Sequence, residues 1–227
     1  VVDPIEGSKP DGQIIVDMMN KMGYAQPDYD AATMLEEISQ IVPFFAGAKW
    51  DTLGDNGKQW PILPDGTDTK ILHGETFRRG KGKFYYYDFK ESEEITSHGK
   101  DYPYIITTNR DLEHYNCGAM TRRTKNVEIH TEDVLWINPK DAQAKGIVNG
   151  DLVCVESPRG KVDIKAFVTE GVNEGVLSTT FHFPEIMVNN ITSDVHDSEA
   201  KCPEYKVVSV NIRKARKTHM RKEGELV

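Results

Sequence analysis

The stretch NPKDAQAKGIVNGDLVCVESPRGKV, residues 138–162, contains the signals that decide the fold. Pro139 suits the first turn of a helix, where its missing N–H is not needed, and Gly146 suits a helix end. The intervening residues are therefore predicted to form one short helix. Two alternating apolar runs follow, at 152–156 and 162–168, separated by the turn sequence SPRG. This spacing predicts a β-hairpin.

Short apolar runs of strand length recur on both sides of this stretch. They contain many β-branched and aromatic residues and are bounded by turn-forming or charged residues, which is typical of β-strands. Further strands are predicted at 84–89, 102–107, 134–137, 176–183 and 207–212, with a charged loop at 90–101. Many short strands and one short helix indicate a mainly β fold with some α, arranged as a closed β-barrel.

The segment TTNRDLEHYNCGAMTRR, residues 107–123, follows the apolar run 104–106 directly. It contains hydroxyl, amide, imidazole and guanidinium groups, which together can hold a polar, anionic ligand at the end of a strand. Arg110 is the strongest candidate, because an arginine just past a buried strand needs either an anionic partner or open water. The alternative interpretation is a solvated loop after an edge strand.

Length and composition restrict the class of protein. At 227 residues and 38 % hydrophobic, the chain can bury a core and is expected to be one domain with appended elements. The net charge of −8 argues against a nucleic-acid surface, and no apolar run reaches the roughly 20 residues that span a bilayer. The three cysteines, Cys117, Cys154 and Cys202, have no disulfide or metal-site spacing. We therefore expect a reducing, cytoplasmic location without membrane insertion.

The N-terminal part has a different pattern. Helices are predicted at 13–22 and 33–42; Thr33 is placed as the cap of the second, and Pro43 ends it. The apolar stripe of the first helix is interpreted as core packing. Residues 44–83 are rich in glycine and proline and are predicted to be an irregular connector.

We therefore divide the chain into three parts. Residues 1–83 are predicted to be the helical tail of a preceding domain plus the connector, 84–213 the barrel, and 214–227 a basic tail. The tail is interpreted as a solvated terminus, with a role in binding a partner subunit or nucleic acid as the alternative. The N-terminus has neither an initiator methionine nor the pattern of a signal peptide, so we expect a chain derived from something longer.

Four segments, in the same order, resemble the dinucleotide-binding domain of molybdopterin oxidoreductases. The first is a T-x-R-x-x-x-H-Y pattern made by Thr108, Arg110, His114 and Tyr115. The other three are the stretch at 138–162, FHFPEIMVNNIT at 181–192 and CPEYKVVSVNIRK at 202–214. The pattern is most similar to that of the formate dehydrogenases. The resemblance implies that the barrel is a double-psi β-barrel preceded by a short helical and irregular segment.

The resemblance also implies which residues contact the cofactor. They are residues of the matched segments that can bind phosphate, a purine edge or a pterin. Arg110 and Lys206 are candidates for anionic oxygens and Asp111 for a guanine edge; Thr108, Asn116 and Asn189 are loop donors, and His114, His182 and Tyr205 can stack or hydrogen-bond at the pterin. The alternatives are a core histidine at 182, a turn at 189–190 and a strand-edge pair at 205–206. Cys117 is expected to be small and buried near the site.

No residues point to an active site within this chain. It lacks a G-x-S-x-G elbow and a G-x-x-x-x-G-K-[ST] phosphate loop, and the carboxylate pairs at 36–37 and 93–94 are adjacent, so they cannot face each other across a substrate. We predict no catalytic and no metal-binding residue. The resemblance places the metal ligand and a 4Fe-4S cluster in an N-terminal part that this chain lacks.

Together these observations predict the C-terminal, cofactor-binding part of a formate dehydrogenase catalytic subunit. The resemblance implies bis-molybdopterin guanine dinucleotide with molybdenum or tungsten as the cofactor. It implies the N-terminal portion of the same subunit and electron-transfer subunits as partners. Two alternatives stay open: another oxidoreductase of the family, such as one similar to nitrate reductase, or a stand-alone β-barrel module that binds a nucleotide or a protein partner.

Overall fold

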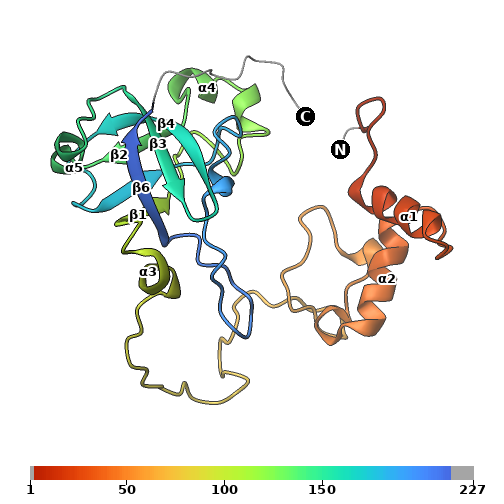
Figure 1. Cartoon of the computed structure of the whole chain (residues 1–227). Coiled ribbons are helices and arrows are strands. Elements are labelled where there is room, and N and C mark those ends of the chain that lie inside the picture. The colour runs from red at the N-terminus through yellow and green to blue at the C-terminus, as the bar shows by residue number, and fades with distance from the viewer. Residues whose placement is uncertain (1–2, 216–227) are drawn as a thin grey trace. The chain divides into compact units, whose positions relative to one another are not determined.

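The computed structural model describes residues 3–215, and Figure 1 shows their helices and strands. The chain divides into two compact units, Val1–Tyr86 and Tyr87–Val227, which are described separately below. The predicted basic tail, beyond its first two residues, lies outside the described residues. Among residues 3–215, no helix has both the length and the apolar character needed to cross a membrane.

Two helices and an irregular connector make up the first unit. Helix α1 is Asp11–Lys21 and α2 is Ala31–Ile41; short 3-10 turns follow at Pro43–Phe45 and Trp50–Thr52. The prediction that Thr33 caps the second helix is wrong. Asp30 is the cap, because its carboxylate accepts a hydrogen bond from the Thr33 backbone N–H at 2.7 Å.

The apolar stripe of α1 is not a core in this chain, contrary to the prediction. Val16 is buried, whereas the side chains of Ile14, Ile15, Met18 and Met22 are exposed. Periodic spacing identifies which residues share a helix face, but burial also requires a second surface to pack against that face. Within the first unit, the helix has no such surface over most of its stripe.

A closed six-stranded barrel forms the second unit within the described residues. The order around the barrel is β1-β5-β2-β4-β3-β6; β1 pairs with β5 and β2 with β4 in parallel, and the other pairs are antiparallel. The prediction of a mainly β fold with a closed barrel is confirmed. The strands are Tyr104–Thr108 (β1), Val134–Ile137 (β2), Leu152–Ser157 (β3), Gly160–Val168 (β4), Val176–Thr179 (β5) and Val208–Lys214 (β6).

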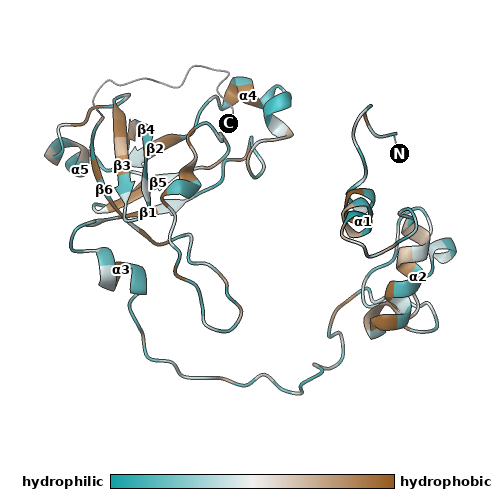
Figure 2. Cartoon of the chain, turned by 45° about the vertical axis from the view of Figure 1, so that its right-hand side comes forward, coloured by the Kyte–Doolittle hydropathy of each residue, from teal (hydrophilic) through white to brown (hydrophobic). Residues whose placement is uncertain are grey.

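The barrel interior is filled by one cluster of apolar side chains. Along β4, burial alternates strictly, with Val162, Ile164 and Ala166 inside and their neighbours outside. In Figure 2 the barrel strands carry apolar colouring, as does part of the α2 region. Leu135, Val153, Val155, Leu177 and Val210 have no exposed surface at all, so the barrel is a packed core and not a channel.

The stretch at 138–162 folds as predicted. Helix α5, Pro139–Ala144, starts at Asn138, whose side chain accepts a hydrogen bond from the Lys140 N–H at 3.0 Å. Gly146 then has a φ of +64°, a value that glycine adopts without strain. The β3–β4 hairpin closes at the Ser157–Gly160 pair.

Three predictions of individual elements in the second part of the chain are wrong. Residues 84–89 are not a strand, and both Phe84 and Phe89 are almost fully exposed. The physical reason is that β1 already pairs with β5 and β6, so the closed barrel offers no free edge for another strand. The strand predicted at 176–183 ends at Thr179, and the charged loop contains a helix, α3, at Glu93–His98.

A buried ion pair attaches α3 to the barrel. The Glu94 carboxylate is completely buried and accepts two hydrogen bonds from the Arg159 guanidinium, at 2.6 and 3.0 Å. The Ser209 N–H and the Ser193 hydroxyl donate to the same carboxylate, at 2.9 and 3.1 Å. Burial alone raises the pKa of Glu94, but the bonds from Arg159 and Ser209 outweigh this effect and hold the pKa below its ordinary value of 4.5.

We expect Arg159→Leu to destabilise the chain by about 3–5 kcal/mol, because it leaves the buried Glu94 carboxylate without a counter-charge. Urea unfolding followed by circular dichroism measures this change. The matched control is Lys140→Met, which breaks the exposed Lys140–Glu174 pair and should leave the unfolding midpoint unchanged. Equal effects of the two substitutions would contradict a special role for the buried pair.

Acid should remove the contribution of this ion pair. Since the pKa of Glu94 is lower in the folded chain than in the unfolded chain, its stabilisation is complete above about pH 5 and is lost as the pH falls through the folded-state pKa. The gap in free energy of unfolding between the natural chain and Glu94→Gln should therefore narrow as the pH falls below about 5. A gap independent of pH would show that Glu94 does not titrate as inferred.

Candidate functional site

The ends of two parallel strands bring the polar segments together. β1 and β5 run in parallel, with Thr108 opposite Thr179 at their C-terminal ends. The pairing continues one residue further, because the Asn109 N–H donates to the Thr179 carbonyl at 2.7 Å and the Asn109 amide donates to the Ser178 hydroxyl. The segment that follows β1 and the segment that follows β5 therefore start at the same end of the barrel.

His182 connects these two segments. Its imidazole is completely buried; Nε2 accepts a hydrogen bond from the Asp111 N–H at 3.1 Å, and Nδ1 donates to the Asn116 carbonyl at 2.5 Å. A backbone N–H can only donate and a carbonyl can only accept, so these bonds determine the tautomer. His182 is therefore neutral, with its proton on Nδ1.

His114 lies beside His182. Its ring is buried, and the two ring centroids are 5.6 Å apart. Nε2 donates to the His130 carbonyl at 2.8 Å, and Nδ1 lies 3.0 Å from the Thr121 hydroxyl. The ring also meets Phe183 edge-on, with centroids 5.2 Å apart. Both predicted histidines are thus held within the protein, where they shape the loops around them.

Two predicted donors lie at the surface of this cluster. Arg110 is exposed; its guanidinium contacts the Asn116 side-chain oxygen at 3.4 Å and lies 5.6 Å from the centre of the Tyr115 ring. Lys206 donates to the Thr108 carbonyl and lies 3.4 Å from the Thr108 hydroxyl. Arg110 has no carboxylate partner among the described residues, so its charge is available to an anionic ligand.

The structure does not bring all the predicted residues together. Contacts join Arg110, Asp111, His114, Asn116 and His182 into one group, and Lys206 contacts Thr108 at the end of β1. Asn189 and Tyr205 are exposed and have no hydrogen bond to this group among residues 3–215. Asn189 lies in a 3-10 turn, Val188–Asn190, where its carbonyl accepts from Thr192 at 3.1 Å. Cys117 is exposed, which corrects the expectation that it is buried.

The loop between these residues is tightly built. Asn116 has a φ of +50° and Gly118 a φ of +70°. A β-carbon added to Gly118 would lie 2.6 Å from the His182 carbonyl oxygen. Only glycine therefore permits this approach of the loop to the segment after β5.

The sequence analysis missed a buried carboxylate, Asp133. It precedes β2 and has no exposed surface. One oxygen accepts from the Thr180 hydroxyl and from the His182 N–H, the latter at 3.2 Å; the other accepts from the Phe183 N–H at 2.9 Å. No local signal marks Asp133 in the sequence, because its donors lie about 50 residues further along the chain.

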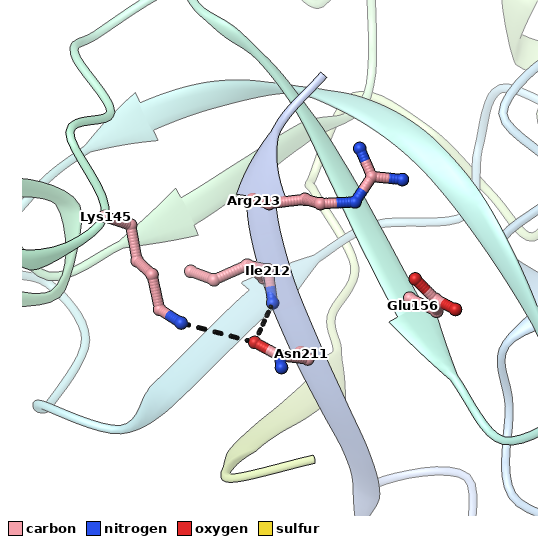
Figure 3. Close-up of a pocket in the computed structure, with 5 residues that line it drawn as sticks. All are labelled: Lys145, Glu156, Asn211, Ile212 and Arg213. Atoms are coloured by element: carbon pink, nitrogen blue, oxygen red, sulfur yellow. Dashed lines mark hydrogen bonds between the residues drawn. The ribbon is translucent and has the colours of Figure 1, made fainter. Parts of the chain in front are cut away.

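A second feature lies at the other end of β1. Lys145, Glu156, Asn211, Ile212 and Arg213 line a shallow pocket of about 280 Å³, shown in Figure 3. β6 runs antiparallel to β1, with Val210 opposite Tyr104, so Asn211 and Arg213 lie beyond the start of β1. The Lys145 amine and the Asn211 side-chain oxygen are 3.3 Å apart. This pocket is separate from the cluster around His182.

Asp133→Asn should destabilise the chain by about 2 kcal/mol or more, because an amide NH₂ would face N–H donors that now meet a carboxylate oxygen. Glu132→Gln is the matched control: Glu132 is the preceding residue, but its carboxylate is exposed and pairs with Lys165. Thermal unfolding of the two variants provides the comparison. The role assigned to Asp133 is wrong if the neighbouring substitution costs as much.

Comparison with known proteins gives a family for this site. Residues 104–209 match the family model described as the molydopterin dinucleotide binding domain. The chain is 38 % identical to the F420-dependent formate dehydrogenase subunit alpha of Methanocaldococcus jannaschii, over 94 % of this chain and 32 % of that protein. It is 37 % identical to the F420-dependent formate dehydrogenase 2 subunit alpha of Methanococcus maripaludis, with the same two coverages.

A solved structure supports the fold. Acetylene hydratase from Pelobacter acetylenicus matches 94 % of this chain and 34 % of its own chain, with a TM-score of 0.58 and 18 % sequence identity. At that identity the likeness concerns the fold alone. The chain thus spans about a third of the length of the curated relatives it matches. The matched range contains the β1 end, His182 and Lys206, and residues 104–209 are identified as a molydopterin dinucleotide binding domain.

Proposed function

We propose that this chain is the C-terminal, cofactor-binding part of a formate dehydrogenase-type oxidoreductase. The observation that carries the proposal is the cluster at the ends of β1 and β5, which lies inside the matched domain and joins five predicted residues, with the Thr108–Lys206 pair at the end of β1. The similarity to formate dehydrogenase alpha subunits over 94 % of the chain supports the choice within the family. The reaction would be oxidation of formate to carbon dioxide, or the reverse.

The exposed groups of the cluster fit a molybdopterin dinucleotide chemically. Arg110 offers a guanidinium that matches phosphate oxygens, and the Asn116 side chain offers an amide beside it. Asp111 presents a carboxylate that can accept from the N–H groups of a guanine. Lys206 adds a second positive charge next to Thr108. Arg110, Asp111 and Asn116 lie on a loop that approaches the segment after β5 closely at Gly118, and this approach restricts the loop geometry.

The protein's contribution in this proposal is binding and orientation. When bound, the metal-bearing pterin supplies the two-electron chemistry. The residues of this chain hold the dinucleotide in place, and the buried imidazoles of His114 and His182 keep the binding loops in one geometry. No group of three or more His, Cys, Asp or Glu side chains in residues 3–215 is placed to hold a metal ion.

The finer parts of the proposal concern the whole enzyme. The cofactor would be bis-molybdopterin guanine dinucleotide with molybdenum or tungsten, with a 4Fe-4S cluster in the N-terminal portion of the same subunit. That portion and electron-transfer subunits would be the partners, in the cytoplasm. Residues 1–83 would be the tail of the preceding domain plus the connector, and 84–213 the cofactor-binding domain. Asn189 and Tyr205, exposed in this chain, would also contact the cofactor.

The first test is to isolate the native protein that contains this chain. Metal analysis should find molybdenum or tungsten, and acid denaturation should release a guanine-containing pterin. A native species free of both metal and pterin would refute the proposal and would favour a stand-alone binding module.

In that native protein, Arg110→Ala should lower the amount of guanine nucleotide retained per chain by about tenfold, because it removes a charge-assisted bond to an anionic oxygen. Lys161→Ala is the matched control: it also removes one positive charge, from an exposed position on β4. Retained nucleotide is measured by chromatography after acid release. If the control loses as much as Arg110→Ala, the effect is due to net charge and not to the site.

A further inference from the structure

Three histidines meet at the proposed site, and two of them are already saturated. His182 accepts from the Asp111 N–H and donates to the Asn116 carbonyl, so both of its nitrogens are used. His114 donates to the His130 carbonyl through Nε2, and its Nδ1 faces a threonine hydroxyl. Neither ring has a nitrogen left for a ligand. These two residues hold the loop in place. Within residues 3–215, neither forms a hydrogen bond to the side chain of Arg110, Asp111 or Asn116.

His130 differs from the other two. It follows the short helix α4, Asn126–Ile129, and its ring is half-buried. Its Nε2 atom is shielded from solvent and lies 2.8 Å from the Asp111 Oδ2 atom, although the two are not aligned for a hydrogen bond. A carboxylate cannot donate, so this nitrogen must carry the proton in a favourable contact.

Asp111 is thereby held at two places. Its backbone N–H is bound by His182, and its carboxylate faces His130. The second carboxylate oxygen, Oδ1, receives no hydrogen bond from any group in residues 3–215. About a quarter of the Asp111 side chain is exposed. A buried nitrogen beside Oδ2 and a partly exposed side chain are suited to orienting the carboxylate toward a ligand.

We propose that His130 is a positioning residue of the dinucleotide site, which holds the Asp111 carboxylate so that it can accept hydrogen bonds from the ligand's N–H edge. This inference rests on the proposed function and adds to it a residue outside the four resembling segments. The Nε2–H group lies 2.8 Å from the carboxylate, and this close polar contact restricts the rotation of the carboxylate. The ligand class is a base with neighbouring N–H donors, such as guanine, since a carboxylate can only accept.

The test compares two substitutions in the native protein with its cofactor bound. In His130→Gln the side-chain NH₂ can occupy nearly the position of Nε2–H, whereas His130→Phe keeps a planar ring without a donor. The rate of guanine-nucleotide loss after dilution should rise about tenfold or more in His130→Phe and stay within about twofold in His130→Gln. Equal rates in His130→Phe and the natural protein would overturn the inference, as would equally fast loss in both variants.

A double substitution separates positioning from general damage. If His130 acts through Asp111, His130→Phe should not accelerate loss further once Asp111→Asn is present. Additive effects would overturn the inference. Should His130→Phe fail to fold, His130→Asn replaces it: its NH₂ falls about one bond short of Asp111, so it should lose nucleotide faster than His130→Gln, and equal rates would again overturn the inference.

Failure of the proposed function gives a different result. In that case the natural protein itself contains no guanine-containing pterin. If instead the natural protein retains the pterin and all the His130 variants retain it equally, the function stands and His130 has no positioning role.

Discussion

The parallel pairing of β1 with β5 is the constraint on which the site depends. It places Thr108 beside Thr179 and directs both following segments to one end of the barrel. Antiparallel pairing of β1 with β6 on the other side closes the barrel and brings Lys206, two residues before β6, to the same end. Residues about a hundred positions apart in the chain can therefore contact one ligand.

Buried polar groups then determine the positions of the segments between the strands. Glu94 binds Arg159, Ser193 and Ser209 and so fixes α3, the β3–β4 turn and the segment before β6. Asp133 performs the same role for the segment after β5. Each carboxylate is completely buried, and each receives enough donors to compensate for its loss of water. These groups restrict the loops more strongly than apolar packing would, because hydrogen bonds are directional.

In this cluster, the residues that hold the loops in place are not the residues that are available to a ligand. The imidazoles of His114 and His182 are buried and saturated, whereas Arg110 and Asn116 are exposed on the same loop. A saturated interior and a free surface are what a preorganised binding site requires, because little order remains to be imposed when the ligand arrives. The chain spans about a third of the length of its curated relatives.

The sequence by itself determined the barrel strands from β2 to β4, the capped helix at Asn138 and the polar segment after β1, because each depends on local patterns of apolar, turn and capping residues. Arg110, Asp111 and His182 were predicted as cofactor contacts, because they lie in segments that resemble the dinucleotide-binding domain. It did not predict the exposure of 84–89 and of the α1 stripe, nor the roles of Asp133, Glu94 and His130. Those depend on which surfaces meet after the barrel closes, and a single residue in a linear sequence carries no record of its distant hydrogen-bond partners. Tertiary structure alone decided that Asp111 lies between two histidines.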